Sequence, residues 1–155
     1  MRVQDIMTKD PASVSPDSSA REAAQVMLRE EVGLVPVVDN GNRLVGVVTD
    51  RDIAIRCVAE GKDGSCSIRE VMSTGDIATC KVSDELDSLM SAMRSEKVRR
   101  IPIVDERGGL VGIVSQADVV RKSRDGASAG QTIGKISEPG GKHAQIGRAS
   151  CRERG

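Results

Sequence analysis

The sequence predicts a mixed α/β fold in which one small unit occurs twice in tandem. Three observations support this: an internal repeat, paired runs of β-branched residues, and amphipathic segments with helical spacing. Residues 35–56 read VPVVDNGNRLVGVVTDRDIAIR and residues 101–122 read IPIVDERGGLVGIVSQADVVRK, at a constant shift of 66 (102 − 36). Similarity at a fixed shift is typical of a duplicated structural unit.

Each repeat begins with a short helix that is followed by a brief extended segment. We expect the helices at residues 3–7 and 68–72, where DIMT and EVMS align at a shift of 65. The extended segments are expected at residues 12–14 and 77–80. The change of shift from 65 to 66 means that one residue is inserted or deleted between these segments and the later strands.

An amphipathic helix is predicted next in each repeat. In the first repeat, Ser19 and Glu22 form a capping-box pattern, which is typical of a helix start. Beyond this start, and again in the second repeat, apolar residues recur every three or four positions and define one buried face. These residues are Ala23, Val26 and Met27 in the first repeat, and Leu86, Leu89, Met90 and Met93 in the second.

Two strands follow as a hairpin in each repeat. The apolar, β-branched runs at residues 34–38 and 44–48 are separated by Asp-Asn-Gly-Asn, and those at 100–104 and 110–114 surround Gly-Gly. Tight hairpin turns need residues that tolerate positive φ, and the Asn-Gly step is expected to provide them in the first repeat.

Each repeat ends in a helix that starts directly after the second strand, near Asp50 and near Gln116. Residues 61–67 are polar and contain glycine, so they form the predicted linker. The expected organisation is a first domain at residues 1–60, a linker at 61–67 and a second domain at 68–122.

The small size of one repeat explains why two are present. A unit of about 55 residues with one open sheet face buries too little apolar surface to be stable by itself. Two copies can pack together around a pseudo-two-fold axis. Equivalent turns of the two copies are then expected at symmetry-related clefts between them.

The remaining residues, 123–155, differ from both repeats in composition. They are rich in Gly, Ser, Lys and Ala and have no periodicity, so we expect disorder. The last eleven residues, QIGRASCRERG, have no counterpart in either repeat. We interpret them as translated sequencing-adapter sequence; the alternative is a basic tail with a role of its own.

Composition excludes several classes of function. Lys plus Arg and Asp plus Glu number 23 each, so a formal net charge of zero gives no electrostatic reason to expect a nucleic-acid or membrane partner. Phe, Tyr and Trp are absent, which removes the side chains on which single-stranded nucleic acids stack. Neither a membrane-length apolar run nor a signal peptide is present, so a cytoplasmic location is expected.

Catalytic and metal-binding side chains are scarce. The single histidine, His143, lies in the tail, and the four cysteines form no Cys-x-x-Cys pair. Because neither a zinc site nor a nucleophile with an adjacent base is evident, we expect no metal and no enzyme activity. The cysteines are expected to be reduced and mostly buried, and Cys66, in the linker, is the candidate for oxidation or metal capture.

Both repeats carry the pattern Ser/Thr-x-x-Asp where the last strand meets the last helix. The pattern is Thr49 to Asp52 in the first repeat and Ser115 to Asp118 in the second. In one interpretation the two side chains cap the helix start. In the other, the hydroxyl and the free helix amides bind a phosphate while the carboxylate accepts hydrogen bonds from a ribose diol. Both can hold at once.

DIMT, VPVVDNGNRLVGVVTDRD and RRIPIVDERGGLVGIVSQAD resemble the cystathionine-beta-synthase (CBS) domain, and the pair resembles a Bateman module. The resemblance covers residues 1 to 122. It implies tandem β-α-β-β-α units that pair into one module, and it implies that the chain forms a homodimer. Relatives bind adenosine nucleotides such as AMP, ADP or ATP, or S-adenosylmethionine, and some bind no known ligand.

The resemblance also assigns roles to particular residues. It implies that Asp52 and Asp118 hold ribose, and that Thr49 and Ser115 lie near ribose and phosphate. The segments 8–14 and 73–80 are implied to close the adenine slot. Side chains implied to line that slot are Val35, Val37, Ile101 and Ile103. Arg99 and Arg100 match a basic pair that reaches phosphate in relatives, whereas the first repeat has Gly33 and Leu34 at these positions.

The expected function is therefore a non-catalytic regulatory module. It binds an adenosine nucleotide as a regulatory ligand in the cleft between the repeats, needs no cofactor, and signals to an unidentified effector protein through a conformational shift. The better phosphate site is expected near Asp118 and the weaker site near Asp52. The alternatives are a ligand-free dimeric interaction module, or a regulatory subunit of an enzyme or transporter. Because the chain starts at Met1 within the first repeat, we expect it to stand alone.

Overall fold

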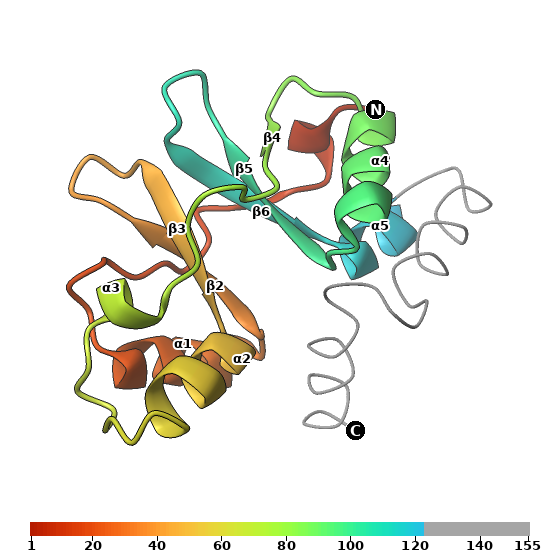
Figure 1. The fold of residues 1–155 in the computed structure, drawn as a ribbon. Coiled ribbons are helices and arrows are strands. Elements are labelled where there is room, and N and C mark those ends of the chain that lie inside the picture. Colours follow the sequence, from red (N-terminus) through yellow and green to blue (C-terminus); the bar gives the residue numbers. More distant parts are fainter. Residues whose placement is uncertain (123–155) are drawn as a thin grey trace. The chain divides into compact units, whose positions relative to one another are not determined.

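The order of helices and strands in the computed structural model, which describes residues 1–122, confirms the predicted α/β fold class (Figure 1). The predicted disorder of residues 123–155, the interpretation of the last eleven residues, His143 and Cys151 all lie outside the described residues. No described helix has the length and apolar character that crossing a lipid bilayer requires.

The elements of the two repeats follow the same order. The first repeat contains η1 (Val3–Asp5), β1 (Thr8–Lys9), α1 (Ala20–Glu30), β2 (Leu34–Val38), β3 (Leu44–Thr49), α2 (Asp50–Ile53) and the π-helical turn η2 (Ala54–Val58). The second contains α3 (Ile68–Val71), β4 (Cys80–Lys81), α4 (Leu86–Glu96), β5 (Arg100–Val104), β6 (Leu110–Ser115) and α5 (Gln116–Lys122).

The described residues form two compact units, which we name by the aspartate that each contains. The Asp118 unit consists of Met1–Asp10, Ala78–Glu106 and 111–122, and the Asp52 unit consists of Pro11–Ile77 and Arg107–Leu110. The start of the first repeat thus belongs to the unit that holds most of the second repeat. Conversely, α3 and the residues after it as far as Ile77 belong to the unit that holds most of the first repeat.

The sheet of the Asp118 unit has the strand order β1-β6-β5-β4 (Figure 1). In this sheet β1 pairs antiparallel with β6, with Thr8 opposite Ile113, and β4 pairs parallel with β5, with Cys80 opposite Ile103. An edge of the sheet is therefore supplied by the first repeat.

The Asp52 unit repeats this arrangement with shorter edges. Its central strands β2 and β3 pair antiparallel. Single bridges join Val14 to Val37 in parallel and Ser73 to Val47 in antiparallel orientation. The pair Val14–Val37 is equivalent to Cys80–Ile103, and the pair Ser73–Val47 is equivalent to Thr8–Ile113. The extended segment predicted at residues 12–14 is therefore reduced to one bridge at Val14.

The glycine of each Leu-Val-Gly motif lies beneath a crossing chain segment. A Cβ atom added at Gly112 would lie 2.5 Å from Met7 Sδ and 3.1 Å from the carbonyl oxygen of Thr8. A Cβ added at Gly46 would lie 2.7 Å from the carbonyl oxygen of Ser73. We call the segments around Thr8 and Ser73 the exchanged segments, because each pairs with a strand of the other repeat. Only a residue without a side chain lets them pair so closely with β6 and β3.

We predict that Gly46→Ala lowers the free energy of unfolding by roughly 1–3 kcal/mol, because the added methyl group overpacks against backbone. Thermal or denaturant unfolding measures the effect. Gly41→Ala is the matched control, since a Cβ there meets only Asp39 Oδ1 at an ordinary 3.5 Å. Equal stability of the two variants would show that the segment around Ser73 shifts without cost.

The hairpin of the first repeat is confirmed, but its turn differs from the expectation. The residue with positive φ is Asn42, at 64°, and not the Asn-Gly step before it. Asp39 organises the turn instead, because its Oδ1 accepts hydrogen bonds of 2.9 Å from the backbone nitrogens of Gly41 and Arg43. In the second repeat Gly108 has φ of 84°, which suits a glycine.

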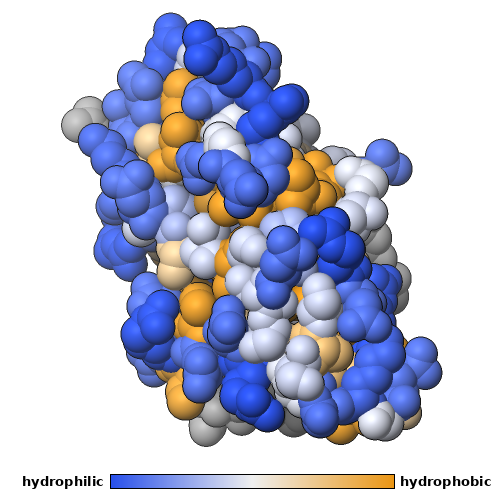
Figure 2. All heavy atoms as spheres, turned by 90° about the vertical axis from the view of Figure 1, so that its left-hand side faces the viewer, coloured by the Kyte–Doolittle hydropathy of each residue, from blue (hydrophilic) through white to orange (hydrophobic). Residues whose placement is uncertain are grey.

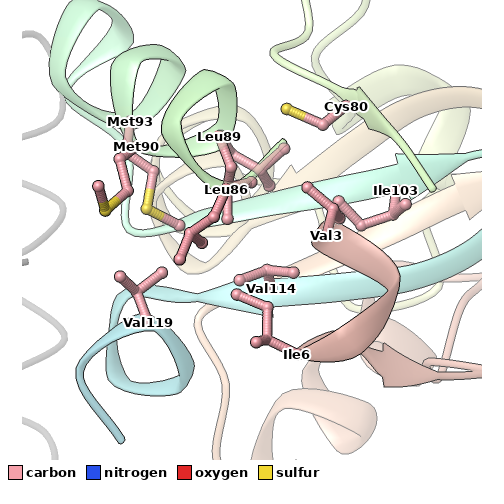
Figure 3. Close-up of a cluster of buried hydrophobic side chains, with 11 residues drawn as sticks. Val3, Ile6, Cys80, Leu86, Leu89, Met90, Met93, Ile103, Val114 and Val119 are labelled. Atoms are coloured by element: carbon pink, nitrogen blue, oxygen red, sulfur yellow. The ribbon is translucent and has the colours of Figure 1, made fainter. Parts of the chain in front are cut away.

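Each unit has its own hydrophobic core, and both amphipathic helices contribute the predicted faces. The Asp118 unit buries Leu86, Leu89, Met90 and Met93 of α4 against η1, β5 and β6 (Figure 3). The Asp52 unit buries Ala20, Ala23 and Val26 of α1 against β2, β3 and α3, and the predicted Met27 is partly buried against the same core. Ser19 caps α1 as predicted, with Oγ accepting a 3.1 Å hydrogen bond from the backbone nitrogen of Glu22.

Candidate functional site

The two Ser/Thr-x-x-Asp turns are reciprocal helix caps with nearly equal geometry. The backbone nitrogen of Thr49 donates to Asp52 Oδ2 at 2.9 Å, and that of Asp52 donates to Thr49 Oγ1 at 3.0 Å. In the second repeat, the backbone nitrogen of Ser115 donates to Asp118 Oδ2 at 2.9 Å, and that of Asp118 donates to Ser115 Oγ at 3.1 Å. The capping interpretation is therefore correct for both turns.

The carboxylate of Asp52 receives a further contact from the exchanged segment. Ser73 Oγ lies 3.3 Å from both carboxylate oxygens. Ser73 is held there by backbone hydrogen bonds with Val47, at 3.0 and 2.8 Å. The alignment of EVMS with DIMT marks this serine in the sequence, but gives no indication that its partner is Asp52.

The carboxylate of Asp118 is held by a cation instead. Arg121 Nη2 donates to Asp118 Oδ1 at 2.6 Å, between residues three apart on α5. The Asp118 side chain is only 10% exposed, whereas that of Arg121 is 65% exposed. An exposed arginine can move away from its partner at little cost. The sequence-based prediction did not include Arg121, although its spacing from Asp118 on a helix was visible.

Each turn also makes a backbone hydrogen bond to the residue that precedes the first strand of its hairpin, β5 in the Asp118 unit and β2 in the Asp52 unit. The carbonyl oxygen of Arg99 accepts a 2.8 Å hydrogen bond from the backbone nitrogen of Gln116. In the Asp52 unit, the carbonyl oxygen of Gly33 accepts a 3.0 Å hydrogen bond from the backbone nitrogen of Asp50. Arg99 therefore lies beside the Ser115–Asp118 turn, while glycine occupies the same place beside Thr49 and Asp52. Arg100 is the next residue and begins β5.

The four apolar residues assigned to an adenine slot lie in the cores of the two units. Each has no exposed surface, and each packs within the cluster of its own unit. A side chain without exposed surface cannot touch a ligand until its neighbours move. Their role as slot lining therefore stays a prediction for Val35, Val37, Ile101 and Ile103.

One buried polar atom beside the Asp118 turn lacks a partner. Among the described residues, Gln116 Oε1 is buried without a hydrogen-bond donor. Leaving such an acceptor unsatisfied costs about 1–3 kcal/mol, so the group is suited to accept a hydrogen bond from a bound molecule. The sequence-based prediction missed Gln116, because Asp50 occupies the equivalent position and no pattern distinguishes it.

Comparison with protein families gives two matches to the family model described as CBS domain, at residues 3–58 and 68–125. The CBS domain-containing protein YhcV of Bacillus subtilis is 41% identical over 135 residues, which are 87% of this chain and 94% of that protein. Inosine-5'-monophosphate dehydrogenase of Methanocaldococcus jannaschii is 30% identical over 135 residues. These are 87% of this chain but only 26% of that enzyme.

Solved structures with the same fold include proteins with bound ligands. Hypoxic Response Protein I with two coordinated zinc ions has a TM-score of 0.72 at 31% identity, covering 79% of this chain and 98% of that one. CBSX2 in complex with AMP has a TM-score of 0.68 at 29% identity, covering 77% and 93%. The CBS domain pair of MJ0100, in complex with 5-methylthioadenosine and S-adenosyl-L-methionine, has a TM-score of 0.69 at 30% identity, covering 78% and 94%.

Proposed function

Because the chain belongs to the CBS domain family, with one CBS domain in each repeat, we propose that it is a non-catalytic regulatory module for an adenosine-type ligand. The observation that carries the proposal is the Asp118 turn. Hydrogen bonds from Ser115 and Arg121 use two of the roughly four acceptor positions of the Asp118 carboxylate, so two remain for a ribose diol.

The ligands of related proteins support this choice. AMP, 5-methylthioadenosine and S-adenosyl-L-methionine, which are bound in two of the similar structures, share an adenosine group. What differs among them is the charge of the group attached to the ribose. The residues that meet that group therefore decide which ligand each unit prefers.

The two units differ in charge at this place. In the Asp118 unit, Arg99 precedes β5 and Arg100 begins it, and Arg121 lies beside the carboxylate. In the Asp52 unit, Gly33 precedes β2 and Leu34 begins it. We therefore assign a phosphate-bearing nucleotide to the Asp118 turn, and a weaker site for a less charged adenosyl ligand to the Asp52 turn.

Ultraviolet absorbance tests the proposed function directly. The chain contains no Phe, Tyr or Trp, so the purified protein itself absorbs almost nothing in the near ultraviolet. We expect an adenine absorbance band from co-purified ligand, or a rise in Tm on adding AMP, ATP or S-adenosylmethionine. A flat spectrum together with an unchanged Tm for all three ligands would leave the alternative of a ligand-free interaction module.

A variant of Gln116 separates ligand binding from folding. We predict that Gln116→Met stabilises the ligand-free protein by about 1 kcal/mol, because the unsatisfied acceptor is replaced by an apolar group of similar shape. The same variant loses part of the rise in Tm that ligand gives. Differential scanning calorimetry with and without AMP measures both effects, and Ala117→Met, at an exposed neighbouring position, is the control. A variant less stable than the parent would show that Gln116 has a partner in the ligand-free protein.

We further propose that the chain forms a homodimer through the Asp52 unit. Figure 2 shows hydrophobic residues at the surface among hydrophilic ones. The most exposed large ones are Leu28 on α1, at 81%, and Val58 on η2, at 68%, with Ile55 one turn earlier on η2. Since α1 packs against α2, which η2 continues, these side chains are suited to meet a second copy.

Val58→Asp is expected to weaken the dimer roughly 100-fold, because it buries an unpaired charge at the interface. Light scattering coupled to size-exclusion chromatography gives the molar mass over a range of concentrations. Thr79→Asp introduces the same charge at an exposed position of the Asp118 unit and is expected to leave the mass unchanged. A parent protein that is monomeric throughout would contradict the proposal.

A further inference from the structure

Two cysteine sulfurs of the Asp52 unit lie in contact with each other. Cys57 is buried in η2, and Cys66 is half-buried in the segment directly before α3. Their Sγ atoms are 3.2 Å apart, with the thiol of Cys66 donating to Cys57. The thiol of Cys57 lies 3.3 Å from the carbonyl oxygen of Asp63. A disulfide bond is about 2.05 Å long, so the sulfurs need to approach by only roughly 1 Å.

The chain between the two cysteines can supply this movement. Residues 58–63 are exposed, whereas Cys57 is fixed in the hydrophobic core of the unit. Cys66 is held through its backbone, because its nitrogen donates to the carbonyl oxygen of Asp63 at 3.2 Å and its carbonyl oxygen accepts from the nitrogen of Ala20 at 2.8 Å. Within residues 1–122, no three His, Cys, Asp or Glu side chains come together as a metal site. The pair is therefore better suited to sulfur chemistry than to metal binding.

We propose that Cys57 and Cys66 are an oxidation site, at which a low-molecular-weight disulfide of the glutathione type produces an intramolecular disulfide bond. The Cys66 thiolate attacks one sulfur of glutathione disulfide and releases one glutathione, which takes up the proton that Cys66 has lost. Cys57 then attacks the Cys66 sulfur in the mixed disulfide and releases the second glutathione. In total the two cysteines lose two electrons and two protons, and glutathione disulfide gains them.

The surroundings of Cys66 make this reaction slow at neutral pH. Burial raises the pKa of the Cys66 thiol to about 11, with further contributions in the same direction from the hydrogen bond to Cys57 and from the charges of Cys57 and Glu70. Lys62 acts in the opposite direction. Only the thiolate reacts, so its small fraction at pH 7 limits the rate. The pair responds to prolonged oxidising conditions and not to brief ones.

The proposed bond joins the two segments that meet at the Asp52 turn. The helix that Thr49 caps continues as α2 and η2 to Cys57. The segment after Cys66 forms α3 and leads to Ser73, whose hydroxyl contacts Asp52. Arg56 already links the two, because its Nη1 donates to the carbonyl oxygen of Met72 at 2.9 Å. The Asp118 unit contains one cysteine among its described residues, Cys80, so the restraint is specific to the Asp52 unit.

Peptide mapping after equilibration with glutathione and glutathione disulfide tests the proposal. The full chain is used with Cys151→Ser and a chelator, so that the tail cysteine and bound metal play no part. We expect a cross-linked peptide pair containing Cys57 and Cys66, lighter than the two reduced peptides by two hydrogen atoms, while Cys80 stays reduced. The rate of formation should rise about tenfold per pH unit between pH 7 and 9, because this range lies below the pKa of Cys66.

Two further variants keep the test independent of folding defects. Cys66→Ser should abolish the cross-link, and Cys57→Ser should accumulate a mixed disulfide of glutathione at Cys66. Cys57→Ser places a hydroxyl group in the core and can fail to fold, but the parent chain and Cys66→Ser do not depend on it. Free thiols at both positions, or glutathione on both without a cross-link, would overturn the proposal.

Hydrogen exchange of the oxidised chain tests the proposed restraint. We expect slower exchange at the amides of Met72 and Ser73, and no change at Met7 and Thr8, the equivalent residues of the Asp118 unit. Equal change in both segments would overturn the link to the Asp52 turn. This readout needs no nucleotide, so its failure is distinct from failure of the proposed function.

Discussion

Asp118→Asn is expected to abolish the stabilisation by an adenosine nucleotide while costing the ligand-free protein about 1 kcal/mol or less. An asparagine oxygen can still accept the hydrogen bond from the backbone nitrogen of Ser115, so the cap persists. The ion pair with Arg121 is lost, but Arg121 is mostly exposed and the pair contributes little. A ribose diol needs two acceptor oxygens, and the amide group replaces one of them by a donor.

Thermal unfolding across a ligand series measures this difference. At a ligand concentration of 100 times Kd, the parent protein gains about 2.7 kcal/mol and the variant gains none. Asp52→Asn is the matched control, because it alters the same cap in the other unit and should keep the response to a phosphate-bearing ligand. If Asp118→Asn loses equal stability with and without ligand, the turn acts only as a helix cap.

The second large effect is expected from exchanging the basic pair for its counterpart in the first repeat. Arg99→Gly combined with Arg100→Leu should weaken AMP binding by at least roughly 100-fold, because charge-assisted hydrogen bonds to phosphate contribute about 1.5–3 kcal/mol each. Adenosine, which lacks the phosphate, should bind the variant and the parent alike. The backbone supports this exchange, since Gly33 makes the same carbonyl contact to its turn as Arg99 does.

Isothermal titration calorimetry with AMP and adenosine distinguishes the outcomes. Raising the salt concentration should weaken AMP binding to the parent more than to the variant, because screening acts on the charged contacts. Equal losses for AMP and adenosine would indicate a general disturbance of the site. Unchanged AMP affinity would mean that the phosphate is bound by other groups.

Much of the fold could be predicted because its signals are local. The β-branched runs gave the strands β2, β3, β5 and β6 to within one residue, and the apolar spacing of α4 gave its buried face. The reciprocal caps were equally accessible, since both partners of each cap lie three residues apart. The conformation of the hairpin turn was predicted less well, because several turn types fit the same residues. Asn42 takes the left-handed conformation that we expected of the Asn-Gly step.

Contacts between distant segments could not be predicted in this way. Gly46 and Gly112 are equivalent positions in the repeat, and each lacks a side chain where another segment crosses closely. The segments around Ser73 and Thr8 are equivalent as well, so the repeat does not say which one pairs with which strand. The contact between Ser73 and Asp52 depends on this choice, as does the meeting of Cys57 with Cys66 in the same unit.

The sequence by itself determined the duplication, the strand and helix order, the two capped aspartates and the uneven charge of the repeats. Each depends on residues that are neighbours in the chain or on direct comparison of two aligned segments. The tertiary structure alone decided the exchange of N-terminal segments, the burial of Val35 and Ile101 in separate cores, and the partners of both carboxylates beyond their caps. These features depend on which segment packs against which strand. The repeated sequence is compatible with either pairing, so only the packing of the folded chain decides between them.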